Sequence, residues 1–311
     1  MEHRLCAHSG LRVSELGLGT LTWGRDTEAA EALEMFEAFL EAGGTVVEGA
    51  PWHGDGAAPD VIGSCLPVVG RRHVVIVWRG GTRFVGGGTQ VPSSAAGDML
   101  ASLDDSLQRL GTDHVDLWLA CPDPDVPLDE SLSALERAHR SGRAAYVGLS
   151  HRGLWDTSRA LAASEFAGRA PVVAIEEEFS LLRATQGREL RDRARAAGIA
   201  VIGHSPLAGG VLTGKYRRTT PPDSRAASEH LSHLVVPYFA SGRNVVEALA
   251  RAAQGLDRSM ADVALVWAKD HPGVASTIVG PRTLRQLESM LAATEPLPTP
   301  IRSVLDEVAG L

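Results

Sequence analysis

Short apolar runs, rich in β-branched residues, alternate along the chain with longer amphipathic segments. Eight such runs predict strands at residues 16–21, 45–47, 73–78, 115–120, 144–149, 172–175, 199–202 and 275–279. The first segment between runs has its apolar residues at i, i+4, i+7 and i+11, on one helix face: Ala29, Leu33, Phe36 and Leu40. A glycine pair, Gly43-Gly44, then ends that helix.

The same periodicity predicts helices near residues 94–110, 129–142, 154–167, 187–197, 242–254, 259–271 and 283–293. Strands separated by helices pair in parallel through right-handed crossovers. Eight such units without a dividing linker favour one closed (β/α)₈ barrel over residues 1–311, and not an open doubly wound sheet. The stretch rich in Pro, Gly and Ser at 219–232 then belongs to a long loop over the barrel mouth, near 207–240.

Composition narrows the class of protein. The 311 residues are 44% hydrophobic and 22% charged, with a net charge of −8. A nucleic-acid partner is therefore not expected, because nucleic-acid-binding proteins usually carry clustered basic residues. No run of about 18 apolar residues predicts a membrane span, and no apolar segment follows the first residues. Three cysteines without a CxxC pair predict neither disulfides nor a metal site. We expect a cytoplasmic protein that acts on a small molecule; its oligomeric state stays open.

In such a barrel the chemistry sits at the carboxyl ends of the strands. Four motifs there resemble the aldo-keto reductase family, in order and over nearly the whole chain. They are LGTLTWG at 18–24, VGLS at 147–150, SPLAGGVLTGKY at 205–216 and GPRT at 280–283. The resemblance implies a (β/α)₈ barrel, NADP(H) and hydride transfer to aldehydes or ketones.

The resemblance breaks down at the family's catalytic tetrad of aspartate, tyrosine, lysine and histidine. Glu48 stands in the place of the aspartate and His53 in the place of the tyrosine. Arg79 replaces the lysine and Cys121 the histidine. The ordinary reductase mechanism therefore lacks every one of its side chains.

The cofactor positions of the family are matched in part. The candidate cofactor-binding residues are Gly19, Thr20, Trp23, Ser150, Phe179, Ser205, Leu207, Gly209, Gly280, Arg282 and Gln286. Phe179 would stack on the nicotinamide ring in place of a tyrosine. Departures from the family pattern occur at His151, Glu176, Ser289 and Met290. The residues expected at the phosphate end of the cofactor site match the family pattern better than those expected at the nicotinamide end. This difference predicts weak or absent NADPH binding.

The substituted residues suggest a division of roles. Imidazole titrates near pH 6.5, so His53 is the candidate general acid or base, with Glu48 orienting it. Arg79 stays charged and suits a carboxylate, an enolate or a phosphate. An equally simple interpretation makes Glu48 and Arg79 a buried ion pair. Cys121 is a weak donor and fits a core position at the mouth. Gly86-Gly87-Gly88 lacks phosphate-loop spacing and suggests a lid loop.

Three functions remain open, in this order. The first is a barrel enzyme that moves protons, by dehydration, isomerisation, cyclisation or carbon–carbon cleavage. The second is a divergent NADPH-dependent carbonyl reductase in which His53 donates the proton. The third is a non-catalytic scaffold or regulatory protein. Ionisable residues at most of the tetrad positions favour the first.

Overall fold

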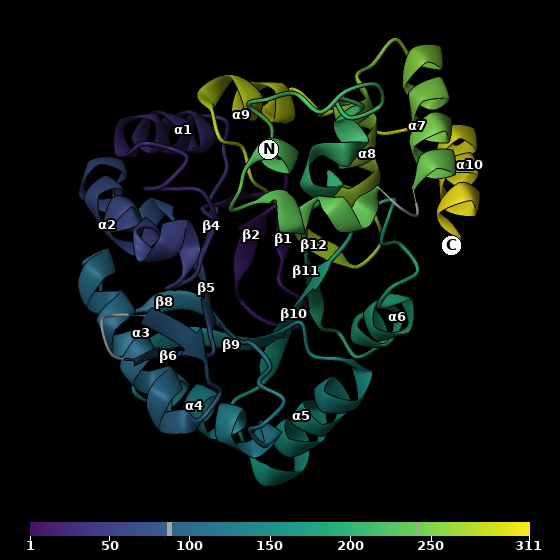
Figure 1. Cartoon of the computed structure of the whole chain (residues 1–311). Helices are drawn as coiled ribbons and strands as arrows, with labels where there is room; N and C mark the ends of the chain where they lie inside the picture. The colour runs from purple at the N-terminus through teal and green to yellow at the C-terminus, as the bar shows by residue number, and fades with distance from the viewer. Residues whose placement is uncertain (86–88, 240–241) are drawn as a thin grey trace.

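A computed structural model describes residues 1–85, 89–239 and 242–311. Its centre is a closed barrel of parallel strands in the order β10-β11-β12-β3-β4-β5-β8-β9, ringed by helices (Figure 1). The strands are β3 (Leu16–Gly19), β4 (Val46–Gly49), β5 (Val75–Gly80), β8 (Val115–Ala120), β9 (Ala144–Ser150), β10 (Val172–Glu178), β11 (Ala200–His204) and β12 (Val274–Val279). The predicted (β/α)₈ barrel is confirmed, with a strand at each apolar run.

The surrounding helices are α1 (Ala29–Glu41), α2 (Ala58–Val69), α3 (Ala96–Leu110), α4 (Leu128–Arg140), α5 (Leu154–Ala167), α6 (Arg188–Ala196), α7 (Arg243–Gly255), α8 (Met260–Lys269), α9 (Leu284–Leu291) and α10 (Thr299–Ala309). The sequence pattern missed α2 and α10. Buried residues lie on several sides of α2, and Pro67 interrupts its pattern. Three prolines, at 296, 298 and 300, precede α10 or lie in its first turn. This proline-rich segment suggested a loop, although proline is tolerated in the first turn of a helix.

The interior of the barrel is closed at the amino-terminal end by a hairpin that the sequence pattern also missed. Strand β1 (His3–Leu5) pairs with β2 (Arg12–Ser14). Side chains of the hairpin pack in the inner core with strand residues: Cys6, Leu11 and Val13 with Val46, Val77, Leu117 and Ile202. A second hairpin, β6 (Thr82–Val85) with β7 (Thr89–Pro92), follows β5. The glycines at 86–88, predicted as a lid, lie outside the described residues.

The loop that follows β11 crosses the carboxyl end of the barrel. It contains the short 3₁₀ helices η4 (Ala208–Thr213), η5 (Arg225–Ala227), η6 (Ser232–Leu234) and η7 (Val236–Tyr238). Arg225 Nη2 donates a hydrogen bond to the carbonyl of Gly280, at 2.6 Å. The Tyr238 hydroxyl donates to Glu178 at the end of β10. The described part of the loop is thus attached to two strand ends at the barrel mouth.

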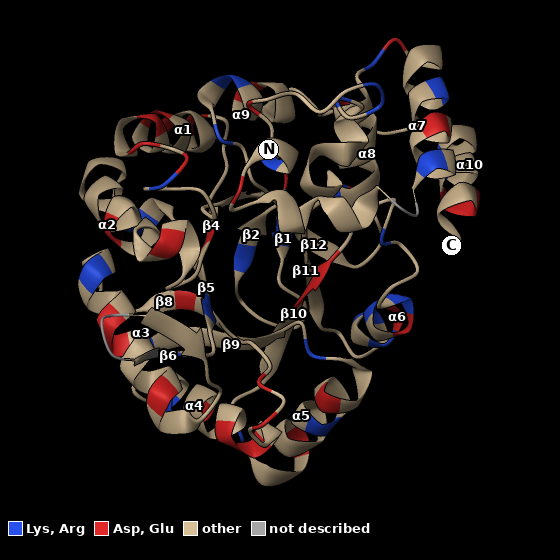
Figure 2. Ribbon diagram, viewed as in Figure 1, with Lys and Arg blue, Asp and Glu red and all other residues tan. Residues whose placement is uncertain are grey.

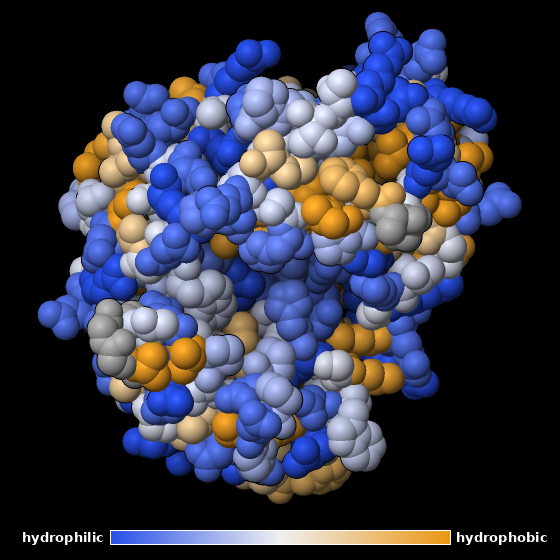
Figure 3. Space-filling model, in the orientation of Figure 1, coloured by the Kyte–Doolittle hydropathy of each residue, from blue (hydrophilic) through white to orange (hydrophobic). Residues whose placement is uncertain are grey.

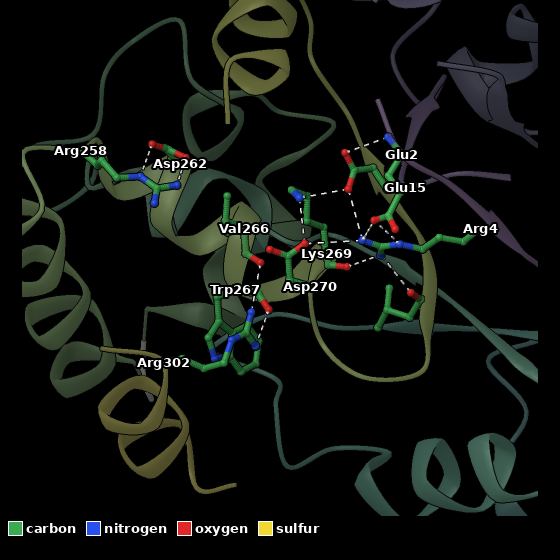
Figure 4. A network of polar contacts seen from close by, with 11 residues as sticks. Glu2, Arg4, Glu15, Arg258, Asp262, Val266, Trp267, Lys269, Asp270 and Arg302 are labelled. Carbon is green, nitrogen blue, oxygen red and sulfur yellow. Dashed lines mark hydrogen bonds and ion pairs between the residues drawn. The ribbon is translucent and has the colours of Figure 1, made fainter. Parts of the chain in front are cut away.

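An ion network ties the first hairpin to the amino-terminal end of the barrel (Figure 4). Lys269 Nζ lies 3.1 Å from Glu15 and 2.8 Å from Asp270. Arg4 contacts Glu2 and Glu15, and its Nη1 donates to the carbonyl of Lys269 at 2.6 Å. We call these five residues the basal network. It joins segments more than 250 residues apart in the chain.

Among the described residues, every helix is too short or too polar to cross a membrane. Those residues also bring together no three His, Cys, Asp or Glu side chains that could hold a metal ion.

Candidate active site

The period-two alternation of the strands brings charged side chains into the barrel mouth. Val46 on β4 and Val77 on β5 point into the inner core. The next inward positions on these strands are therefore Glu48 and Arg79. Ala174 on β10 places Glu176 inward in the same way. Most charged residues lie on the outer helices and loops (Figure 2), so this layer differs from the rest of the interior.

These side chains line a cavity of about 100 Å³ at the carboxyl end of the barrel. Figure 3 shows a hollow in the middle of this face, with hydrophilic residues around it. The lining residues are Gly19, Leu21, Glu48, His53, Arg79, Glu176, His204, Ser205, Arg225, Ile278 and Gly280. Residues from six of the barrel strands or the loops after them therefore share one small, polar cavity.

Arg79 lies between two carboxylates. Its Nε is 2.8 Å from Glu48 Oε1 and 3.8 Å from Glu176 Oε2. Ser150 Oγ donates a hydrogen bond of 2.6 Å to Glu176 Oε2. The two glutamates are 5% and 0% exposed, so both carboxylates are inside the protein. Glu48 and Arg79 thus form the buried ion pair that was one of the two interpretations of the sequence.

Burial dominates the acidity of Glu48. It raises the pKa of this carboxyl to about 7, with a further rise from Glu176, against the opposing effect of Arg79. Burial lowers the pKa of Arg79, but the two glutamates outweigh it and raise this pKa above its ordinary value. Glu48 therefore exchanges a proton near neutral pH while Arg79 remains charged.

His53 is held from both sides. Arg79 Nη2 donates to its Nε2 at 2.5 Å, so the ring proton is on Nδ1, which lies 3.1 Å from Thr20 Oγ1. Burial, with Arg79 and His204, lowers the pKa of His53 well below its ordinary value. The prediction that His53 titrates near neutrality is wrong, because the neutral ring is buried beside a cation. The ring of His53 instead positions Arg79 through the hydrogen bond to its Nε2.

We call the four residues Glu48, His53, Arg79 and Glu176 the mouth cluster.

Cys121 lies just outside the cavity lining, after β8. Burial raises the pKa of its thiol to about 11, which keeps it protonated at neutral pH. Its backbone carbonyl accepts a hydrogen bond of 2.9 Å from Arg152. This thiol is a packing residue of the mouth, and its environment gives it no thiolate character.

A second cavity, of about 250 Å³, adjoins the first and shares Ser205, Arg225 and Gly280 with it. Candidate cofactor residues line it: Ser205, Leu207, Gly209, Gly280, Arg282 and Gln286. Lys215 and Arg225 line it too, and neither they nor Arg282 form an ion pair with a carboxylate of the described residues. Burial, together with Arg282, lowers the pKa of Arg225. Cations without counterions suit an anionic ligand such as a phosphate.

At the nicotinamide end of the predicted cofactor site, four residues do not lie where the sequence analysis expected them to contact the cofactor. Phe179 is fully buried and stacks on Trp267, with ring centres 5.1 Å apart, so it cannot stack on a nicotinamide ring. Trp23 is also fully buried, against Phe36. Thr20 contacts His53, and the Ser150 hydroxyl is taken up by Glu176. Of the first-strand residues predicted to bind cofactor, only Gly19 lines the cavity.

The sequence analysis placed His204 at a strand end and Lys215 in a family motif, but it named neither these two residues nor Arg225 as site residues. His204 ends β11, and its Nε2 lies 3.1 Å from Nε2 of His151. His204 is two positions after Ile202, whose side chain points into the barrel, so its inward direction could have been predicted from the strand alternation. Arg225 had no such signal, because it comes from an irregular loop whose path depends on tertiary contacts.

Comparison with known proteins agrees with this geometry. A sequence model of the aldo/keto reductase family matches residues 15–306. The uncharacterized oxidoreductase YrpG of Bacillus subtilis is 30% identical over 95% of this chain and 91% of its own. The aldo-keto reductase YhdN of the same organism is 26% identical over 94% and 89%. A probable voltage-gated potassium channel subunit beta of Oryza sativa is 28% identical over 100% and 96%.

The fold and the mouth of the barrel define a (β/α)₈ protein with a cavity lined by three cationic side chains beside a smaller polar one. The chain belongs to the aldo/keto reductase family. Members of this family usually bind NADP(H), and the phosphate end of the site fits such a ligand through Lys215, Arg225 and Arg282. The nicotinamide end does not show the predicted contacts of Ser150 and Phe179.

Proposed function

We propose that this protein is an enzyme that transfers protons, and not hydride, on a small carbonyl or carboxylate compound. The observation that carries the proposal is Glu48, which lines the small polar cavity, has a pKa of about 7 and contacts Arg79. A carboxyl that titrates near neutrality is present in both protonation states at the working pH, as general acid–base catalysis requires. Isomerisation, dehydration, cyclisation and lyase reactions all use such a group.

The roles follow from the contacts. Ionised Glu48 accepts a proton from a carbon next to the substrate carbonyl; the C–H bond breaks and its electron pair becomes an enolate. Arg79, held by Glu48 and His53, stabilises the enolate oxygen. Return of the proton to a neighbouring atom completes an isomerisation, and departure of a leaving group completes an elimination. Glu176 raises the basicity of Glu48.

A second candidate is an NADPH-dependent carbonyl reductase, favoured by the unpaired cations of the 250 Å³ cavity. NADP(H) supplies hydride when it is bound, and Lys215, Arg225 and Arg282 would hold its phosphates. Glu48 would then donate the proton to the carbonyl oxygen, because neutral His53 carries its one ring proton on Nδ1 and donates it to Thr20 Oγ1. A third candidate, a non-catalytic subunit, takes support from the relatives that are probable subunits of voltage-gated potassium channels.

The test is proton exchange in D₂O. Short 2-oxo and 3-oxo acids are incubated with the protein, and proton NMR follows the loss of the hydrogen next to the carbonyl. We expect exchange without NADPH, reduced in Glu48→Gln by about 10²–10⁴-fold. Glu34→Gln, on the exposed face of α1, is the matched control. Oxidation of NADPH by carbonyl compounds, without such exchange, would support the reductase instead.

A further inference from the structure

Two histidines meet at the carboxyl end of β10. His151 follows β9 and His204 ends β11, and these two strands flank β10 in the barrel. The backbone fixes both residues there. The His151 N–H donates a hydrogen bond of 3.0 Å to the carbonyl of Glu176, and the His204 carbonyl accepts one of 3.0 Å from the N–H of Phe179. The two rings lie edge to face, with centres 4.7 Å apart and Nε2 atoms 3.1 Å apart.

A third residue extends this contact into the mouth of the barrel. His204 Nδ1 lies 3.0 Å from Ser205 Oγ, and Ser205 lines both mouth cavities. At the other end of the contact, His151 is exposed and lines a separate pocket beside α6, together with Glu177. Ser205, His204 and His151 therefore form a continuous chain of hydrogen bonds from the cavity to solvent.

The two outer members of this chain have a strained backbone. His151 has a φ of 52° and Ser205 a φ of 55°, in the left-handed region that residues other than glycine rarely adopt. Residues in such a conformation persist where the surrounding structure requires them, and they cluster at active sites. Here the two strained residues are those whose side chains contact the two nitrogens of the His204 ring.

Both rings are neutral near pH 7. Burial lowers the pKa of His204 well below its ordinary value, and His151 and Arg79 lower it further. Loss of hydrating water also lowers the pKa of His151, where Arg79 adds to the effect and Glu176 opposes it. A neutral imidazole has one N–H donor and one acceptor nitrogen, so it can take up a proton at one nitrogen while it releases another. Two such rings in contact can pass a proton on without becoming charged.

We propose that Ser205, His204 and His151 carry a solvent proton to the leaving group in the elimination of water from a short β-hydroxy carbonyl compound. The proposal rests on the proposed function, because Glu48 makes the first proton transfer. Strands β11 and β4 are separated by β12 and β3, so Ser205 and Glu48 line the cavity from different sides. An elimination needs a base and an acid placed in this way. We call the three residues the relay.

The protons and electrons of this step balance. Glu48 takes the proton next to the carbonyl, the electron pair of the enolate forms a C=C bond, and the C–O bond to the hydroxyl breaks. The leaving oxygen takes the proton of Ser205 Oγ, which takes one from His204 Nδ1. His204 Nε2 then takes the proton of His151 Nε2, and His151 Nδ1 takes one from water. After product release, the proton on Glu48 passes through water in the cavity and out along the relay, which restores the first tautomers.

The first experiment needs no substrate. In protein labelled with ¹⁵N at histidine, long-range proton–nitrogen NMR correlations at neutral pH show which ring nitrogens carry a proton. We expect both relay rings to be neutral, with one proton between their Nε2 atoms. Ser205→Ala should shift the ring nitrogen signals of His204 and leave those of His114, at the opposite end of β8, unchanged. A charged relay ring, or His204 signals that do not respond, would overturn the proposal.

The second experiment follows two reactions of a short 4-hydroxy-2-oxo acid in D₂O by proton NMR. The vinyl protons of the product measure elimination, and loss of the hydrogen on carbon 3 measures proton removal by Glu48. We expect His151→Gln and Ser205→Ala to reduce elimination relative to proton removal by about 10²–10⁴-fold. The glutamine amide keeps a hydrogen bond near the position of Nε2 but cannot relay a proton. His114→Asn is the matched control, because His114 contacts only Asp113.

Free imidazole distinguishes proton transfer from a structural role. His151 is exposed, so imidazole can reach the space left in His151→Ala and should restore elimination there but not in Ser205→Ala. Equal elimination in the wild type and His151→Gln, or no rescue by imidazole, overturns the relay. Proton removal without elimination in the wild type also overturns it and leaves the proposed function intact. Absence of both reactions contradicts the proposed function and the relay with it.

Discussion

The two ends of the barrel both hold buried charges, and they hold them in different ways. In the basal network each buried side-chain nitrogen and oxygen of the described residues has a hydrogen-bond partner. In the mouth cluster Glu48 Oε1 and Arg79 Nε form an ion pair of 2.8 Å without hydrogen-bond geometry, and the buried Glu176 Oε1 has no hydrogen-bond partner among the described residues. Buried polar atoms are normally paired, so incomplete pairing marks a place where a ligand can complete the contacts.

The difference follows from burial and hydrogen bonding, because each group has one more carboxylate than cation. In the basal network, the carbonyls of Lys269 and Val274 accept further hydrogen bonds from Arg4. At the mouth, burial above all, with a smaller effect of Glu176, raises the pKa of Glu48. In (β/α)₈ barrels the amino-terminal face serves stability and the carboxyl face serves chemistry. The contrast agrees with the proposed site at the carboxyl face of this chain.

Breaking the basal network should have the largest effect. Lys269→Met leaves Glu15 and Asp270 without their ammonium partner in a site where Lys269 is 3% exposed. Removing one partner of a buried ion pair costs about 3–5 kcal/mol. We expect the free energy of unfolding in urea to fall by this amount. The unchanged pH dependence of the mouth cluster is the internal control, and a loss below 1 kcal/mol would contradict the structural role.

The mouth cluster should make the free energy of unfolding depend on pH. Folded Glu48 has a pKa of about 7 against an ordinary 4.5, so between these values the folded chain binds a proton that the unfolded chain has lost. The free energy of unfolding therefore falls as pH rises from 4.5 to 7, by about 3 kcal/mol. Urea unfolding at several pH values measures it. In Glu48→Gln the part of this fall that Glu48 contributes should disappear, whereas Glu177, whose pKa burial also raises to about 7, keeps its own part. A fall as large as that of the wild type would exclude Glu48.

The anion cavity gives a smaller effect on binding. Arg225→Met removes a buried guanidinium from the lining of both cavities. Hydrogen bonds to charged groups contribute about 1.5–3 kcal/mol, so binding of NADPH should weaken by roughly 10–100-fold. Fluorescence titration measures the affinity. Arg217→Met is the control, since Arg217 pairs with Glu247 outside the cavity. Equal affinities of the two variants would exclude Arg225 from the anion site.

The smallest effect is expected at Cys121. Its protonated thiol contacts the mouth without lining the cavity. Cys121→Ala should change the free energy of unfolding by less than about 1 kcal/mol and should leave proton exchange unaffected. A tenfold loss of exchange in this variant would return Cys121 to the reaction.

The fold could be predicted because the strand and helix periods are explicit in the sequence. In the apolar run Val115–Ala120, Leu117 and Leu119 pack inside the barrel, whereas Trp118 and Ala120 pack outside it against the helices. The meeting of Glu48 and Arg79 also followed from their places at the ends of early strands. The state of His53 could not, because it depends on the Arg79 and Thr20 contacts that bury a neutral ring. The prediction that Phe179 stacks on a nicotinamide ring was wrong for a related reason, because its side chain packs against Trp267 instead.

The alternation of the strands has a consequence for how such a barrel can change its chemistry. Val46 and Val77 pack two positions before Glu48 and Arg79 on the same strands. The inner core and the reacting layer are therefore separate sets of residues that share one backbone. Substitutions in the upper set alter acidity and ligand charge while the lower set continues to close the barrel. A reaction can thus be replaced by exchanging a handful of side chains, without inventing a new scaffold.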